Sequence, residues 1–136
     1  MIVADANVVA SFILRAEETE LVLRLLAADP RWVSPPLIRS ELRSVLTQQV
    51  VAKRLGLADA QTAFALAMDT LEDATLEPDE ARVLELAVGS GCSSYDCEYV
   101  SVASALGCAL ATFDRRVLRA FPDIARHPRE FLASPA

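Results

Sequence analysis

Short apolar segments alternate with longer amphipathic segments along the chain, and this alternation restricts the fold more than any other feature. In the first example, residues 2–4 are Ile, Val and Ala and lead into Asp5 without a turn residue between them. A run of this kind predicts a short strand buried on both faces. Strands that alternate with helices predict a parallel sheet with right-handed crossovers. We therefore expect an α/β fold with three layers, α/β/α, around a central, mainly parallel sheet of about 4–5 short strands.

The bounds of the expected elements follow from apolar periodicity and from Pro, Gly and Ser at segment ends. Strands are expected near residues 1–4, 31–34, 74–76, 92–94 and 108–112. Helices are expected over residues 8–14, 17–28, 35–55, 57–73, 78–88, 95–106 and 114–121, with a final helical turn at 129–132. Ser94 is the expected N-cap of the helix over 95–106. No repeat or linker interrupts the pattern, so residues 1–136 are expected to form a single domain.

The composition excludes several classes of protein. With 53% hydrophobic residues the chain is not expected to be disordered, and no apolar run is long enough to span a membrane. The N-terminus lacks a positively charged region and a signal peptide pattern, so we expect a cytoplasmic protein. The three cysteines form no C-x-x-C pair and are expected to be buried free thiols. His127 is the only histidine, which argues against a catalytic histidine pair.

Four acidic residues stand where a parallel sheet would bring them together. Asp5 ends the first strand, Glu41 lies one turn into the helix after the second, Asp96 begins the helix after the fourth, and Asp114 follows the fifth. The carboxyl ends of parallel strands share one edge, so these side chains are expected at that edge. Each also has an ordinary explanation as a helix cap, a first-turn acid or a solvated glutamate. The set of four favours a common site.

Carboxylates this close together repel one another, and a divalent cation would remove the repulsion. A set of oxygen ligands without His or Cys favours Mg²⁺ or Mn²⁺ over Zn²⁺. Such an ion retains water, which can serve as the nucleophile at a phosphate group. Asn7 and Thr112 lie beside the acids and either orient a water or a phosphate oxygen, or are ordinary turn and strand-end residues.

The distribution of charged residues indicates which kinds of partner the protein can bind. A net charge of −6 argues against a protein that coats nucleic acid without specificity. Arginines are nevertheless frequent near the C-terminus, and arginine binds phosphate oxygens bidentately. Arg115 and Arg116 directly follow Asp114 and are possible contacts for RNA or a protein partner, with a solvated surface as the alternative.

Several motifs, taken in their order along the chain, resemble those of PIN-domain nucleases, and especially the VapC toxins of bacterial VapBC toxin–antitoxin pairs. The motifs are Asp5-Ala6-Asn7, residues 36–41, Ser94-Tyr95-Asp96 and residues 112–116. The resemblance implies a ribonuclease that depends on Mg²⁺ or Mn²⁺, with Asp5 and Asp96 as principal metal ligands. Glu41 and Asp114 would complete the acidic pocket. The resemblance also implies a homodimer and a cognate VapB-like antitoxin whose C-terminal segment fills the pocket, often with an arginine.

Four other functions are alternatives to that of a ribonuclease. A phosphoacceptor receiver domain needs a lysine at the end of its last strand, whereas the only lysine here is Lys53, in a predicted helix. A haloacid-dehalogenase-like phosphatase needs two aspartates flanking one residue, and Asn7 stands in place of the second. A non-catalytic PIN-fold binding module and a metal-dependent DNA nuclease are the remaining alternatives, because the metal chemistry acts on phosphate and not on the sugar.

Overall fold

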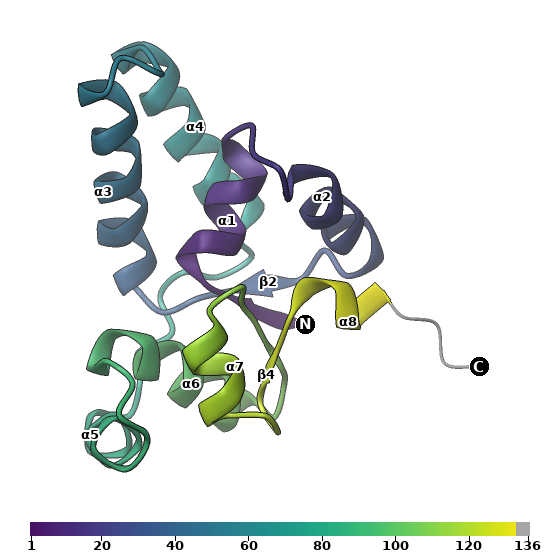
Figure 1. Ribbon diagram of the computed structural model, residues 1–136, viewed down its shortest axis with the longest axis vertical. Helices are drawn as coiled ribbons and strands as arrows, with labels where there is room; N and C mark the ends of the chain where they lie inside the picture. Colours follow the sequence, from purple (N-terminus) through teal and green to yellow (C-terminus); the bar gives the residue numbers. More distant parts are fainter. Residues whose placement is uncertain (133–136) are drawn as a thin grey trace.

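The computed structural model of the protein describes residues 1–132 and places a parallel sheet between two layers of helices (Figure 1). The strands are β1 (Ile2–Ala4), β2 (Trp32–Val33), β3 (Leu110–Ala111) and β4 (Ala125–Arg126). They pair in the order β2-β1-β3-β4, and each pairing is parallel. The predicted three-layer α/β/α fold is confirmed. Because β1 and β3 are the central pair, the segments that follow them leave the sheet side by side.

The helices divide between the two faces of the sheet. They are α1 (Ala6–Ile13), α2 (Thr19–Ala28), α3 (Leu37–Val51), α4 (Leu57–Thr70), α5 (Glu80–Ser90), α6 (Ser94–Leu106), α7 (Arg115–Ala120) and α8 (Pro128–Leu132). Helices α1 to α4 lie on one side and α5 to α7 on the other, while α8 packs against α2 (Figure 1). None of the helices in residues 1–132 is both long and apolar enough to cross a bilayer.

The strands β1, β2 and β3 are short and buried, as their apolar sequences predict. Val3 and Leu110 on the central strands are almost inaccessible to solvent. Trp32 on β2 is also fully buried, and its ring meets Phe12 of α1 edge to face at 6.2 Å. Beyond β2, the Ser34 hydroxyl donates to the Ala4 carbonyl at 2.6 Å. This bond ties the carboxyl ends of two neighbouring strands together, at the edge where the acids were expected.

All three cysteines are free thiols, as predicted. Cys92 and Cys97 are buried, as expected, whereas Cys108 is only half-buried, contrary to the prediction.

Two of the predicted strands are wrong. Residues 74–76 form no strand, and only an isolated parallel bridge joins Asp73 to Val33. Residues 92–94 are also not a strand, because α6 already begins at Ser94. Its N-cap is Ser93 and not Ser94, since the Ser93 hydroxyl accepts a hydrogen bond from the Asp96 N–H at 3.1 Å. Asp96 is therefore brought to the site by a helix alone.

Element ends near turns also differ from the prediction. The strand β4 was missed, because its two residues carry no apolar run and Arg126 is exposed. Helix α3 ends at Val51, before the left-handed Lys53 with φ of 59°, and α4 ends at Thr70. Helix α5 starts only at Glu80, because Asp79 is its N-cap. These differences move helix ends but leave the order of the remaining elements unchanged.

Candidate active site

Asp5 is the first residue beyond β1 and also the N-cap of α1. Its Oδ1 accepts a hydrogen bond from the Val8 backbone N–H at 3.0 Å, as an N-cap carboxylate does. Its own backbone N–H donates to the Ala111 carbonyl at 3.3 Å, which fixes it against the end of β3. Asp5 can therefore cap α1 and take part in a site with the same side chain.

Asp114 lies just beyond β3 and is held in a similar way. Its Oδ1 accepts hydrogen bonds from the backbone N–H groups of Arg116 at 2.8 Å and Val117 at 3.3 Å. Its own N–H donates to the hydroxyl of the buried Thr112 at 3.0 Å. Both central strands are thus followed by an aspartate whose orientation is fixed by the first turn of the next helix.

Glu41 and Asp96 come from opposite helical layers. Glu41 lies in the second turn of α3, and Asp96 lies in the first turn of α6. Tyr99 follows Asp96 by one turn on the same face of α6, and its hydroxyl donates to Glu41 Oε1 at 2.6 Å. This bond links α3 to α6 across the edge of the sheet.

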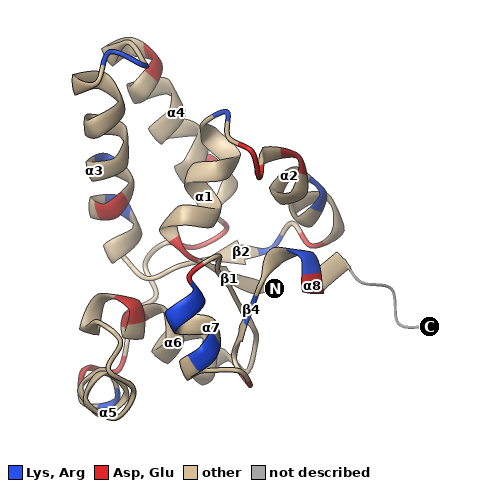
Figure 2. Cartoon of the chain, in the orientation of Figure 1, with Lys and Arg blue, Asp and Glu red and all other residues tan. Residues whose placement is uncertain are grey.

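All four acids line one pocket of about 210 Å³. Its lining residues are Asp5, Ala6, Asn7, Glu41, Ser44, Val45, Asp96, Tyr99 and Asp114. The set contains no Lys, Arg or His, so no basic side chain lines the pocket. Figure 2 shows acidic positions at the starts of α1 and α7 and on α3, around the same end of the sheet. The structure therefore brings together acids from distant parts of the sequence, and the two farthest apart, Asp5 and Asp114, are separated by 109 positions.

The pocket disfavours negative charge. Burial raises the pKa of Asp5 to about 6, and the nearby charges of Glu41 and Asp96 add to the shift, while the Thr112 hydroxyl and the Val8 N–H oppose it. Burial also raises the pKa of Glu41, with a further contribution from Asp96, although the hydrogen bond from Tyr99 opposes this. Burial and the bond to Glu41 raise the pKa of the Tyr99 phenol, which stays a hydrogen-bond donor.

These residues suit a hard divalent cation by their chemistry. The donors are carboxylate, hydroxyl and amide oxygens, and their mutual repulsion is the kind that a cation relieves. As they stand, no three Asp, Glu, His or Cys side chains within residues 1–132 are grouped closely enough to hold a metal ion. Mg²⁺ is usually bound through about one or two carboxylates and several waters, which this pocket can supply without such a group. Which acids would bind directly stays a prediction.

The other residues predicted for the site differ in whether they line the pocket. Asn7 is exposed and lines the pocket, while Thr112 lies behind it and contacts Asp5 and Asp114. Arg115 and Arg116 are not among its lining residues. Sequence reasoning missed the site roles of Tyr99 and Ser44. Both could have been found by helical spacing, because each lies three residues after a predicted acid and hence on its face.

Glu98 is a further acid that was not predicted. It is half-buried, and its pKa is raised by burial and by the charges of Glu41 and Glu77. Glu98 does not line the pocket but adds to its negative field.

With this geometry established, comparison with known proteins defines the class. Residues 2–125 match the PIN domain, which is most of the chain. The chain therefore belongs to the PIN domain family.

Curated relatives within that family narrow the class. The chain is 34% identical over 121 residues to the VapC ribonuclease Mb0985 of Mycobacterium bovis, covering 86% of this chain and 88% of that protein. The same identity and coverage relate it to the ribonuclease VapC9 of Mycobacterium tuberculosis. The VapC-type identity expected from the motifs is thus confirmed.

Solved structures agree on the fold. PAE2754 from Pyrobaculum aerophilum has a TM-score of 0.77 at 21% identity, covering 96% of this chain and 92% of that one. VapBC2 from Rickettsia felis, bound to a DNA fragment from its promoter, has a TM-score of 0.70 at 17% identity, covering 93% and 98%.

Proposed function

We propose that this protein is an endoribonuclease that depends on Mg²⁺ or Mn²⁺ and acts as the toxin of a toxin–antitoxin pair. The observation that carries the proposal is the convergence of Asp5, Glu41, Asp96 and Asp114, from four different elements, on one pocket without a basic side chain. The similarity to VapC ribonucleases over most of the chain supports RNA as the substrate.

Each acid has a distinct part in this proposal. Asp5 and Asp96 would hold the metal, which when bound would lower the pKa of a water ligand and offset negative charge at the phosphate. Asp5 is suited to this because its N-cap bond fixes its carboxylate at the wall of the pocket. Glu41 and Asp114 would complete the site, binding through water or holding a second ion.

Neutral side chains would orient the reacting groups. The Tyr99 hydroxyl fixes one oxygen of Glu41 at 2.6 Å, so the other oxygen remains to accept a proton or a hydrogen bond from water. Asn7 is exposed at the rim, where its amide can donate to a phosphate oxygen. Thr112 supports Asp5 and Asp114 from behind.

The partner proposals rest on the relatives. One fold neighbour is a VapBC complex, which supports a VapB-like antitoxin as partner of this chain. An arginine from such a partner would find four carboxylates in the pocket and no basic side chain of this chain among its lining residues. We also propose a homodimer, as the family resemblance implies.

The proposal is tested by incubating the purified protein with a mixed pool of single-stranded RNA and matched DNA. With Mg²⁺ or Mn²⁺ we expect new RNA ends, and with EDTA none. Zn²⁺ should give lower activity, because it prefers nitrogen and sulfur ligands. Cleavage of DNA in preference to RNA would establish the DNA nuclease alternative. No cleavage of either, with metal bound, would favour a binding module.

A further inference from the structure

Two further cavities lie one after the other beyond the acidic pocket. One, of about 310 Å³, shares Asn7 with the acidic pocket and runs along α1. The other, of about 450 Å³, lies between α7, β4 and α8 and is called here the α7–α8 cavity. These two cavities share Glu18 and Phe113. Because of these shared residues the three cavities lie next to one another, from the four acids to the C-terminal helices, and together they are called here the groove.

The charge changes along this groove. The acidic pocket has no basic residue, whereas Arg115 and Arg129 line the α7–α8 cavity together with Glu18 and Glu130. One of these acids is engaged, because Glu130 Oε2 accepts a hydrogen bond from the His127 backbone N–H at 3.1 Å. Figure 2 shows the basic positions of α7 next to the acidic start of α1. On a protein of net charge −6, a polyanion can be held beside the acids only where such cations flank them.

Two aromatic rings stand in the same cavity. Phe113 and His127 both line it, and their rings pack edge to face with centroids 5.1 Å apart. The His127 Nδ1 accepts a hydrogen bond from the Arg129 backbone N–H at 3.2 Å, so the neutral imidazole carries its proton on Nε2 as a donor. Aromatic rings beside arginines are the means by which proteins bind unpaired bases and their phosphates.

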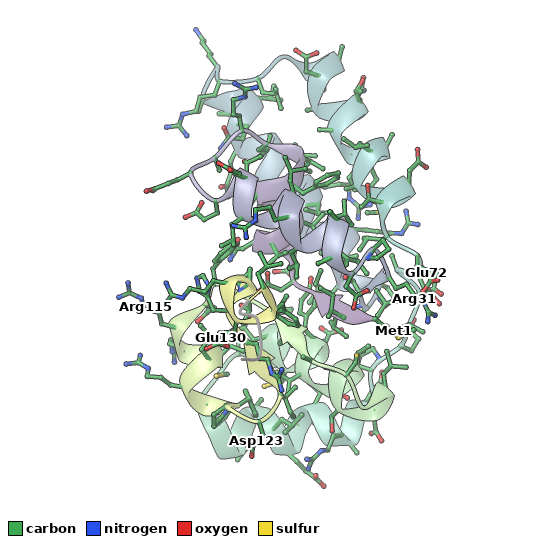
Figure 3. The ribbon with its side chains drawn as sticks, turned by 90° about the vertical axis from the view of Figure 1, so that its right-hand side faces the viewer. Met1, Arg31, Glu72, Arg115, Asp123 and Glu130 are labelled. Carbon is green, nitrogen blue, oxygen red and sulfur yellow. The ribbon has the colours of Figure 1, made fainter. Side chains whose placement is uncertain are left out.

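The structure also separates two arginines that the sequence left equivalent. Arg115 lines the α7–α8 cavity and extends from α7 into solvent (Figure 3). Arg116 donates to the Gly91 carbonyl at 3.0 Å and lines a different cavity with Cys92 and Arg119. Only the first of the pair is placed to contact a strand that lies in the groove.

We propose that the groove binds single-stranded RNA on one side of the cleaved bond. A flanking base would pack against Phe113 and His127, and its phosphate would meet Arg115 and Arg129. This inference deepens the proposed function and rests on it. A protein segment in the same groove is the competing occupant. The RNA strand is favoured because the groove joins arginines and aromatic rings directly to the pocket that would cut the phosphate chain.

The test compares two charge reversals on one helix, R115E and R119E, which have the same net charge. Binding of a fluorescent single-stranded RNA is measured by anisotropy in the non-cleaving D5N background, over a range of salt concentrations. We expect R115E to weaken binding about tenfold and to lower the slope of log K against log salt by about 0.7, the value for one phosphate contact on a single strand. R119E should stay within about twofold of the parent.

The proposed packing of a base against Phe113 is tested by the cleavage kinetics of F113L, a substitution that keeps most of the buried apolar volume. We expect KM for a long RNA to rise about tenfold, because stacking of one base is lost, with kcat nearly unchanged. An RNA too short to reach the cavity should be cleaved equally well by F113L and the wild type. A general loss of structure would instead lower kcat for both substrates.

Each contrary result has a distinct meaning. Equal losses of affinity and salt dependence in R115E and R119E would overturn the groove while leaving the ribonuclease intact. Normal RNA binding by R115E, with lost binding of a VapB-like antitoxin, would assign the groove to that partner and overturn the RNA proposal. Failure of the wild type to cleave RNA would overturn the proposed function, and the binding comparison would still decide the groove.

Discussion

Carboxylates at the two edges of the sheet have opposite surroundings. At the amino edge, Asp29 pairs with the Met1 amino group at 2.8 Å. Glu72 pairs with Arg31 at 3.2 Å, and these two side chains lie together in Figure 3. Burial alone would raise the pKa of Asp29, but its hydrogen bonds to the N-terminal amine and to the Arg31 N–H lower it overall. At the carboxyl edge, the acids lie together without a basic side chain, and the pKa of Asp5 is raised to about 6.

The difference shows which edge is adapted to a ligand. Surface ion pairs such as those at the amino edge add a little to the stability of the fold. A group of partly buried acids without cations opposes folding, and a protein retains such a group where an external charge completes it. The two edges therefore suggest stability at one end of the strands and function at the other.

The largest expected effect is on catalysis. D96N should lower RNA cleavage by at least about a hundredfold, because even indirect loss of metal-binding geometry has effects of that order. The matched control is D69N, the same substitution at an exposed position of α4 outside the pocket. Initial rates at saturating Mg²⁺ measure both. Equal activity of the two variants would remove Asp96 from the site.

A second expected effect is a gain in stability. Without metal at pH 7.5, D5N should raise the free energy of unfolding by up to about 3 kcal/mol, because one pKa unit corresponds to about 1.4 kcal/mol and asparagine still caps α1.

The pH dependence of this gain has a definite sign. The folded-state pKa of Asp5 lies above its ordinary value of 3.8, so ionised Asp5 opposes folding at neutral pH. The opposition weakens as the pH falls through about 6 and is gone below about 4, where D5N and the wild type should be equally stable in this respect. Urea unfolding at pH 7.5, 5 and 3.5 measures the trend. A D5N protein that is less stable at pH 7.5 would contradict it.

A bound metal ion should offset the destabilisation that the ionised acids of the pocket cause. At about a hundredfold excess over its Kd, Mg²⁺ should raise the free energy of unfolding of the wild type by about 3 kcal/mol. D5N should gain much less. Thermal unfolding with increasing Mg²⁺ measures both, and K⁺ at equal ionic strength is the control for screening. An equal gain with K⁺ would show that no specific site is filled.

The smallest effect should come from the amino edge. D29N removes the pair with the Met1 amino group and should lower the free energy of unfolding by less than about 1 kcal/mol. The loss should shrink in high salt, because both partners are partly exposed. Urea unfolding with and without 1 M NaCl tests this. A loss equal in size to the gain in D5N would remove the contrast between the edges.

The sequence was sufficient where one strong pattern decided the structure. The apolar run of residues 2–4 before Asp5 predicted both a central strand and an acid at its end, since burial on both faces leaves few alternatives. Asp114 was predicted for the same reason after β3. The pairing order β2-β1-β3-β4, which puts these two acids side by side, depends on long-range contacts that no local pattern records.

Weaker local signals gave the errors. Ser93 and Ser94 are both good caps, and which of them starts α6 depends on how that helix packs on the sheet. The short β4 pairs with β3 through backbone atoms alone, so its residues carry little strand signal. The hydrogen bond from Tyr99 to Glu41 spans 58 positions and needed the relative placement of two helices. Likewise, only the fold separates Arg115 from Arg116.

The most direct test of the central claim is an anomalous difference map from a crystal of this protein soaked in Mn²⁺. The claim predicts a peak in the pocket about 2.1 Å from an oxygen of Asp5 or Asp96, with Glu41 and Asp114 at bonding distance or one water away. No peak there, or a peak only at other acids on the surface, would contradict it.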